Sequence, residues 1–141
     1  MASENSKNPK KGRDFQEKVK GVLDKKFNKK HESLSVAIGK PPKNHNYDLV
    51  SKDQEIFVEC KCLTWTITGN SPSAKLAAIN EAVFLLSFLS ASKRKIIVLN
   101  KATHPKREKT LARHYFDTYK HLLGDIEIFE LDEKDSLNQI K

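Results

Sequence analysis

Apolar residues along the chain fall into two kinds of spacing, one typical of helices and one typical of strands. Between residues 13 and 30 they recur every three or four positions, which marks one face of an amphipathic helix. These positions are Phe15, Val19, Val22, Leu23 and Phe27. Residues 73–91 and 107–123 also show helical periodicity. Residues 73–91 are apolar around much of the helix circumference, which indicates a buried helix. The pattern therefore predicts three helices.

Five shorter segments have the length and composition of strands: residues 35–38, 47–51, 55–63, 95–100 and 126–131. The first three are separated only by turn-forming residues, so we expect them to pair as a meander. The last two follow predicted helices, which favours parallel crossovers. This order predicts an α/β fold with a central mixed β-sheet flanked by helices on both faces.

The chain of 141 residues has the length of one domain. We expect a flexible basic tail over residues 1–11, a single domain over 12–131 and a frayed acidic tail over 132–141. The start lacks the apolar run of a signal peptide, and the longest apolar run, residues 82–89, is too short to span a bilayer. Cys60 and Cys62 lie two positions apart on a predicted strand, where a disulfide would be strained. Two reduced thiols indicate an intracellular, cytoplasmic protein without a membrane partner.

Charge is distributed unevenly along the chain, which carries a net charge of +8. Residues 1–43 contain 12 Lys/Arg and 5 Asp/Glu, a net +7, and residues 93–113 contain 8 and 1, again +7. Residues 124–141 contain 2 and 6, a net −4. The two basic segments indicate a polyanionic partner such as nucleic acid. A lysine-rich solvated surface explains them equally well.

Two charged residues, Glu59 and Lys61, lie side by side on an otherwise apolar predicted strand, residues 55–63. Because side chains alternate along a strand, Glu59 and Lys61 are expected on one face together with Phe57 and Leu63. Burying a carboxylate and an ammonium group costs free energy unless they pair or bind a ligand. The pair is therefore either a functional site or a structural ion pair. Asp48 lies on the preceding strand, across a short turn, and that strand pairing would bring it near Glu59.

The combination of Asp48, Glu59 and Lys61 contains the parts that a phosphodiester hydrolase needs. Two neighbouring carboxylates repel each other unless a cation lies between them, and oxygen ligands suit Mg²⁺, for which Mn²⁺ can substitute. A lysine beside them can position a water molecule and stabilise negative charge on a phosphate.

Asp48 followed by Glu59-Cys60-Lys61 resembles the D…(D/E)xK signature of the restriction-endonuclease-like, or PD-(D/E)xK, nuclease superfamily. The order of elements over residues 12–100 is similar to the core of that superfamily. The resemblance implies that Asp48, Glu59 and the Cys60 carbonyl bind the metal and that Lys61 is the catalytic lysine. It also implies a catalytic-site position on the first helix, where a glutamate is frequent. Gln16, at the edge of the apolar stripe, occupies that position, although an ordinary helix-edge residue is an equal alternative.

The resulting expectation is a Mg²⁺-dependent endonuclease that hydrolyses the phosphodiester bonds of duplex or branched DNA. By analogy, cleavage of both strands implies a homodimer. A non-catalytic nucleic-acid-binding module that retains the nuclease fold is one alternative, favoured by glutamine at position 16. A basic interaction domain with a purely structural Glu59–Lys61 pair is the other.

Several further residues are weaker candidates for contacts with nucleic acid. Ser73 and Lys75 lie at a predicted helix start, where phosphate can bind, although a capping serine and a solvated lysine are the commoner outcome. Trp65 is a candidate for stacking on a base, but core packing is commoner. The remaining candidates are loop or strand-end residues: Lys43, His45, Lys106 and Arg107. No zinc-ligand spacing or nucleotide-binding glycine loop occurs in the sequence.

Overall fold

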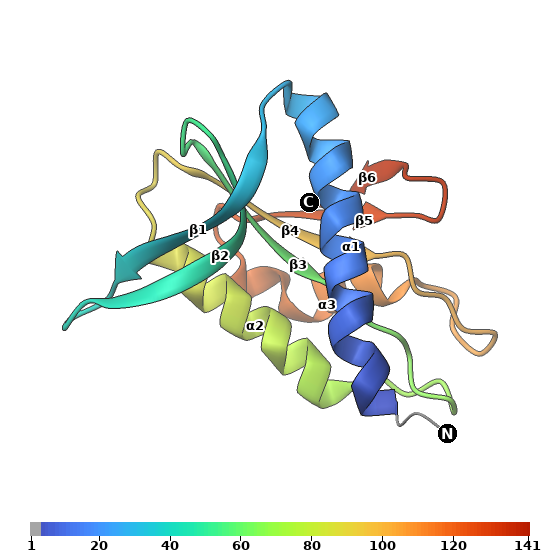
Figure 1. Ribbon diagram of the computed structural model, residues 1–141. Helices are drawn as coiled ribbons and strands as arrows, with labels where there is room; N and C mark the ends of the chain where they lie inside the picture. The colour runs from blue at the N-terminus through green and yellow to red at the C-terminus, as the bar shows by residue number, and fades with distance from the viewer. Residues whose placement is uncertain (1–3) are drawn as a thin grey trace.

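The computed structural model describes residues 4–141 of the chain and the side chains from residue 10 onward. The helices are α1 (Glu4–Phe27), α2 (Ser73–Ser87) and α3 (Leu111–Tyr119), followed by the short 3₁₀ helix η1 (Lys120–Leu122). The strands are β1 (His31–Ile38), β2 (Lys43–Ser51), β3 (Ile56–Lys61), β4 (Arg94–Asn100), β5 (Glu127–Leu131) and β6 (Leu137–Gln139). Figure 1 shows these elements in space.

The strands form one six-stranded mixed sheet in the order β1-β2-β3-β4-β5-β6. Strands β1, β2 and β3 are antiparallel because short turns join them, whereas β3, β4 and β5 are parallel because α2 and α3 lie in the connections. Strand β6 returns antiparallel to β5. The prediction of an α/β fold with a mixed sheet is therefore confirmed.

Alternate residues of β4 contribute to two different apolar clusters, because successive side chains of a strand point in opposite directions. Ile96 and Val98 pack in a cluster that contains the apolar face of α1, including Val19 and Leu23. Ile97 and Leu99 pack in a cluster that contains buried residues of α2 and α3. Figure 1 shows α1 lying across the strands. The 3.6-residue periodicity of α1 thus buries one stripe against the sheet.

The two ends of the chain differ from the prediction. The first helix begins at Glu4, within the segment expected to be a flexible tail, and residues 1–3 of that segment lie outside the described residues. The expectation of a frayed end over residues 132–141 is wrong, because β6 pairs with β5 there. The Asp132 carboxylate accepts hydrogen bonds from the amides of Lys134 and Ser136, which stabilises the connecting turn. Leu137 then packs against the cluster that contains α1.

Helix boundaries also differ from the pattern. Helix α3 begins at Leu111 rather than near 107, because the Thr110 side chain caps it by accepting a hydrogen bond from the Arg113 amide. Helix α2 begins at Ser73 as expected, but its N-cap is Pro72, without a side-chain hydrogen bond. Ser73 is therefore not a capping residue. Over residues 4–141, none of the helices combines the length and apolar character that crossing a membrane requires.

Candidate active site at the β2–β3 fork

Strands β2 and β3 pair at only one end of their length. Their register pairs are Leu49 with Val58 and Val50 with Phe57. Strand β2 continues beside β1 as far as Lys43, whereas β3 continues beside β4 as far as Lys61. A register shift in the β1–β2 pairing, between Glu32 and Leu34, falls close to this point. We call the place where the two strands part the β2–β3 fork, defined by Asp48, Glu59, Cys60 and Lys61.

Asp48 bridges the two strands through its side chain. Its Oδ2 accepts a hydrogen bond of 2.8 Å from the Cys60 amide, so a carboxylate satisfies a donor of β3 at the fork. The Asp48 carbonyl oxygen accepts a hydrogen bond of 3.1 Å from Gln16 Nε2 on α1. The structure therefore places Gln16 next to Asp48, and its amide nitrogen contacts the backbone of β2.

Glu59 is a buried carboxyl group, with only 4% of the residue exposed. Its Oε1 lies 3.0 Å from Nε2 of His45. Burial, the charge of Asp48 and a hydrogen bond with it together raise the pKa of Glu59 to about 9, against the opposing charge of Lys61. Asp48 and Glu59 therefore lie close together, and the neutral form of Glu59 is favoured near pH 7.

Lys61 follows two residues after Glu59 and is half-buried. It forms no ion pair with a carboxylate of residues 10–141, although its charge lowers the pKa of Glu59. An ion pair between Glu59 and Lys61, one of the two alternatives left by the sequence, is absent among these residues. The ammonium group thus lies near the carboxyl groups without being neutralised by them.

Cys60 of β3 and Cys62, just after that strand, are free thiols that pack against the cluster containing the apolar face of α1. Burial raises the pKa of the Cys60 thiol well above its usual range, and the charges of Asp48 and Glu59 raise it further. Burial also raises the pKa of Cys62, while Lys11 and Lys75 lower it. Lys11 of α1 and Lys75 in the first turn of α2 therefore lie within electrostatic range of the end of β3.

The loop after β4 has a structural role that the sequence did not indicate. His104 Nε2 lies 2.9 Å from the carbonyl oxygen of Ile67, and Arg107 Nε donates a hydrogen bond of 2.7 Å to the carbonyl of Gly69. A Cβ on Gly69, whose φ is +88°, would come within 3.0 Å of the His104 ring, so glycine is required there. The Arg107 guanidinium lies 4.6 Å from the ring centroid of Trp65. This loop is therefore fixed against residues 65–69.

Other predicted contact residues are distributed around the molecule. Trp65 is buried and donates its indole hydrogen to the Ala102 carbonyl, so it packs in the core rather than presenting a face to a base. Lys43 and Lys106 are exposed. His45, expected in a loop, lies instead on β2 and faces Glu59. The only sequence signal for this contact is its position two residues before Tyr47 on the same strand, because residues i and i+2 share a face.

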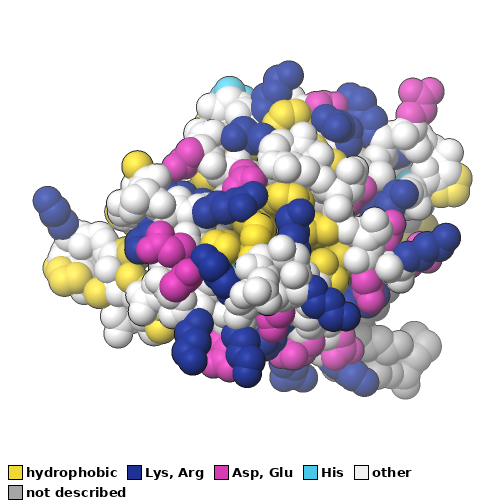
Figure 2. Space-filling view, turned by 90° about the horizontal axis from the view of Figure 1, so that it is seen from above, with side chains coloured by type: hydrophobic (Ala, Val, Ile, Leu, Met, Phe, Trp, Pro, Cys, Tyr) yellow, Lys and Arg dark blue, Asp and Glu magenta, His cyan; other side chains and the backbone are white. Residues whose placement is uncertain are grey.

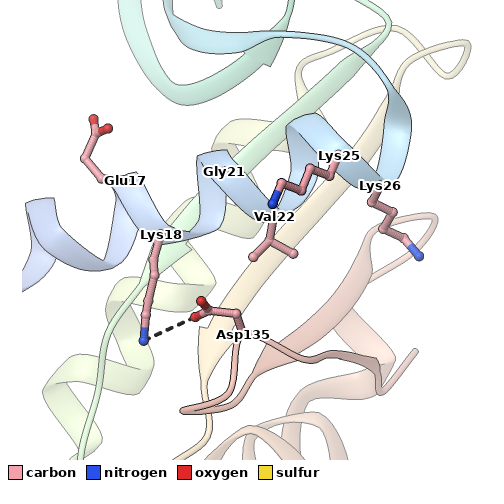
Figure 3. A pocket seen from close by; sticks show the side chains of 7 residues that line it. All are labelled: Glu17, Lys18, Gly21, Val22, Lys25, Lys26 and Asp135. Atoms are coloured by element: carbon pink, nitrogen blue, oxygen red, sulfur yellow. Dashed lines mark ion pairs between the residues drawn. The ribbon is translucent and has the colours of Figure 1, made fainter.

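Charged side chains elsewhere are mixed in sign. Figure 2 shows Lys and Arg side chains interspersed with acidic ones around an apolar strip, rather than gathered in one patch. Figure 3 shows an open groove along α1 in which Lys18 pairs with Asp135 at 3.3 Å. Its other lining residues are Glu17, Gly21, Val22, Lys25 and Lys26. This groove contains none of the fork residues, and its opposite charges partly cancel.

Among the residues described, no group of three His, Cys, Asp or Glu side chains is arranged to hold a metal ion. The side chains that the structure brings together at the fork are Asp48, Glu59, Lys61, Gln16 and His45. No protein-family model, curated protein or solved structure was found to match this chain.

Proposed function

We propose that this protein is a divalent-metal-dependent endonuclease that hydrolyses DNA phosphodiester bonds. The observation that carries the proposal is the convergence of Asp48 and Glu59 where β2 and β3 part, with the ammonium group of Lys61 unpaired beside them. We further propose that the sheet, with α1 on one face and α2 and α3 on the other, is a restriction-endonuclease-like core. The fold by itself does not imply this activity, so the argument depends on the site.

The chemistry of the two carboxyl groups fits a hard cation. The rise in the pKa of Glu59 reflects burial and the proximity of Asp48, and a divalent cation would offset both by favouring the ionised form of each group. Carboxylate and carbonyl oxygens are the ligands of Mg²⁺, which usually keeps several waters and needs only one or two carboxylates. Asp48, Glu59 and the Cys60 carbonyl would hold the ion, with Mn²⁺ as a substitute. Such an ion supplies activation of water and neutralisation of phosphate charge.

Lys61 and the residues around the fork have separate roles in this proposal. The Lys61 ammonium group stabilises the negative charge that develops on the phosphate and helps to position the attacking water. Gln16 fixes the backbone of β2 at Asp48. Lys11 and Lys75, near the end of β3, are suited to the flanking phosphates of the DNA strand. Cutting both strands of a duplex would favour a homodimer, which supplies two such sites.

A second candidate function is a non-catalytic DNA-binding module that retains the nuclease fold. The observation that favours it is the amide of Gln16, which replaces a carboxylate and is already hydrogen-bonded to the Asp48 backbone. A glutamine adds no negative charge for a second cation. In this case the basic residues would bind DNA and the fork would not cut it.

Plasmid cleavage separates the two functions. Wild type is incubated with supercoiled DNA and Mg²⁺ or Mn²⁺ beside Asp48→Asn, which keeps an oxygen for the Cys60 amide but removes the charge. Asp117→Asn is the matched control, because Asp117 is a partly buried carboxylate on α3 that is paired with Lys109, away from the fork. We expect cleavage by wild type and the control and none by Asp48→Asn. Cleavage that survives Asp48→Asn contradicts the site, and DNA binding without cleavage in all three proteins supports the binding module.

A further inference from the structure

His45 makes the most direct side-chain contact with Glu59 outside the fork itself. Its Nε2 lies 3.0 Å from Glu59 Oε1, although the two residues are fourteen positions apart. Because only 4% of Glu59 is exposed, water has little access to orient the carboxyl group. The direction of that group therefore depends on its protein partners, and His45 is the one that approaches along β2.

The imidazole ring of His45 is itself held in place by packing. Its centroid lies 4.6 Å from that of the Tyr47 ring, at an interplanar angle of 87°, an edge-to-face contact. Tyr47 is fully buried, and its hydroxyl donates a hydrogen bond of 2.7 Å to the carbonyl of Leu85 on α2. A second edge-to-face contact joins Tyr47 to Phe57 on β3. A connected series of contacts thus runs from α2 through Tyr47 and His45 to Glu59.

We propose that His45 is a positioning residue that donates its Nε2 hydrogen to Glu59 and thereby directs the carboxyl group toward Asp48 and the cation. This inference rests on the function proposed above and adds a residue that the nuclease signature does not contain. An ionised carboxylate only accepts hydrogen bonds, so His45 must be the donor once Glu59 binds a cation. Carboxylates that ligate metals are commonly held by outer hydrogen bonds, and loss of such a partner weakens metal affinity.

Three substitutions separate hydrogen bonding from packing. His45→Phe keeps a ring against Tyr47 but removes the donor, His45→Gln keeps an N–H donor without the imidazole, and His45→Ala removes both. His104→Ala is the matched control, because His104 is also partly buried and its Nε2 also makes one hydrogen bond, to the Ile67 carbonyl away from the fork. Thermal denaturation of each full-length variant establishes that it folds.

The first measurement is Mn²⁺ binding by isothermal titration calorimetry, which does not depend on cleavage. We expect the Kd for Mn²⁺ to rise at least about ten-fold in His45→Phe and His45→Ala. We expect His45→Gln to recover most of that loss and His104→Ala to match wild type. The second measurement is DNA cleavage, in which the His45→Phe defect should appear in kcat rather than in KM for DNA. This kcat defect should become smaller as the Mn²⁺ concentration is raised, because mass action offsets weaker cation binding.

The outcomes distinguish failure of this inference from failure of the proposed function. Unchanged Mn²⁺ affinity in His45→Phe, with binding abolished in Asp48→Asn, overturns the role of His45 and leaves the nuclease intact. An equal loss in His45→Gln and His45→Phe also overturns it, because hydrogen-bond donation would then not be what matters. Absence of both Mn²⁺ binding and cleavage in wild type overturns both proposals.

Discussion

Replacing Glu59 with glutamine should stabilise the protein, and the gain should grow with pH. Glutamine has the shape of the protonated acid: its amide can still donate toward Asp48 and accept from His45. In the folded protein the pKa of Glu59 is raised to about 9 from the ordinary 4.5, chiefly by burial and then by Asp48. A raised carboxyl pKa means that between these values the folded state holds a proton that the unfolded state has released. Stability from this group is therefore complete below pH 4.5 and decreases as pH rises toward 9.

The magnitude follows from the distance between the working pH and 4.5, the unfolded pKa. Each pH unit in this window costs wild type roughly 1.4 kcal/mol from this one group. The cost is about 1 kcal/mol at pH 5 and on the order of 5 kcal/mol at pH 8. Glutamine at position 59 does not titrate, so the variant does not incur this loss of stability. The stability difference between variant and wild type should therefore increase by about 4 kcal/mol across these three pH units.

Urea denaturation at pH 5, 6, 7 and 8 measures this difference, with Glu32→Gln on the exposed edge of β1 as a control for losing one negative charge. Titrating groups that do not contact Glu59 are common to both proteins and cancel in the comparison. Adding Mn²⁺ at about one hundred times its Kd at pH 8 should recover about 3 kcal/mol in wild type, because the ion binds the ionised carboxylates. A stability difference that stays constant or shrinks between pH 5 and pH 8 would refute the reasoning.

Three further predictions test the site and the core. Lys61→Met should bind Mn²⁺ with wild-type affinity, measured by calorimetry. Its kcat for plasmid cleavage should fall by about 100-fold or more, because Lys61 stabilises the negative charge that develops on the phosphate. Tyr47→Phe should reduce the free energy of unfolding by about 1 kcal/mol in urea titrations, because the Leu85 carbonyl loses the hydroxyl but keeps the Phe88 amide. Ile97→Ala, at a fully buried position of β4, should cost about 3 kcal/mol in the same assay, and a loss below about 1 kcal/mol would contradict the packing assigned to it.

The identity and order of the main helices and strands followed from the sequence because their periodicities are local. An apolar residue every three or four positions describes α1, and continuous apolar residues describe β4. Strand β6 was missed because three residues in a charged segment carry no such periodicity. Its formation depends on the Asp132 turn and on pairing with β5, which are contacts that a pattern along the chain does not record.

The candidate site was predictable in its members more than in its geometry. Alternation along β3 was enough to place Glu59 and Lys61 on one face, and the short turn before β3 indicated that Asp48 would lie nearby. The contacts that hold these residues were not predictable. Gln16 and Asp48 are 32 positions apart, and His45 and Glu59 are 14 apart. Spacing between such residues contains no information about their separation in space.

The sequence alone therefore determined the types of the main elements, the mixed sheet and the three charged candidate residues on β2 and β3, which are Asp48, Glu59 and Lys61. Only the tertiary structure decided that β2 and β3 part beyond the Leu49–Val58 pair and that the Asp48 carboxylate meets the Cys60 amide there. It also decided that Glu59 lies against His45 instead of forming an ion pair with Lys61. The physical reason is that side-chain direction within a strand is fixed by backbone geometry over two residues. The distance between strands is instead fixed by the register shift beside β1 and by packing of α1 and α2, which involve the whole chain.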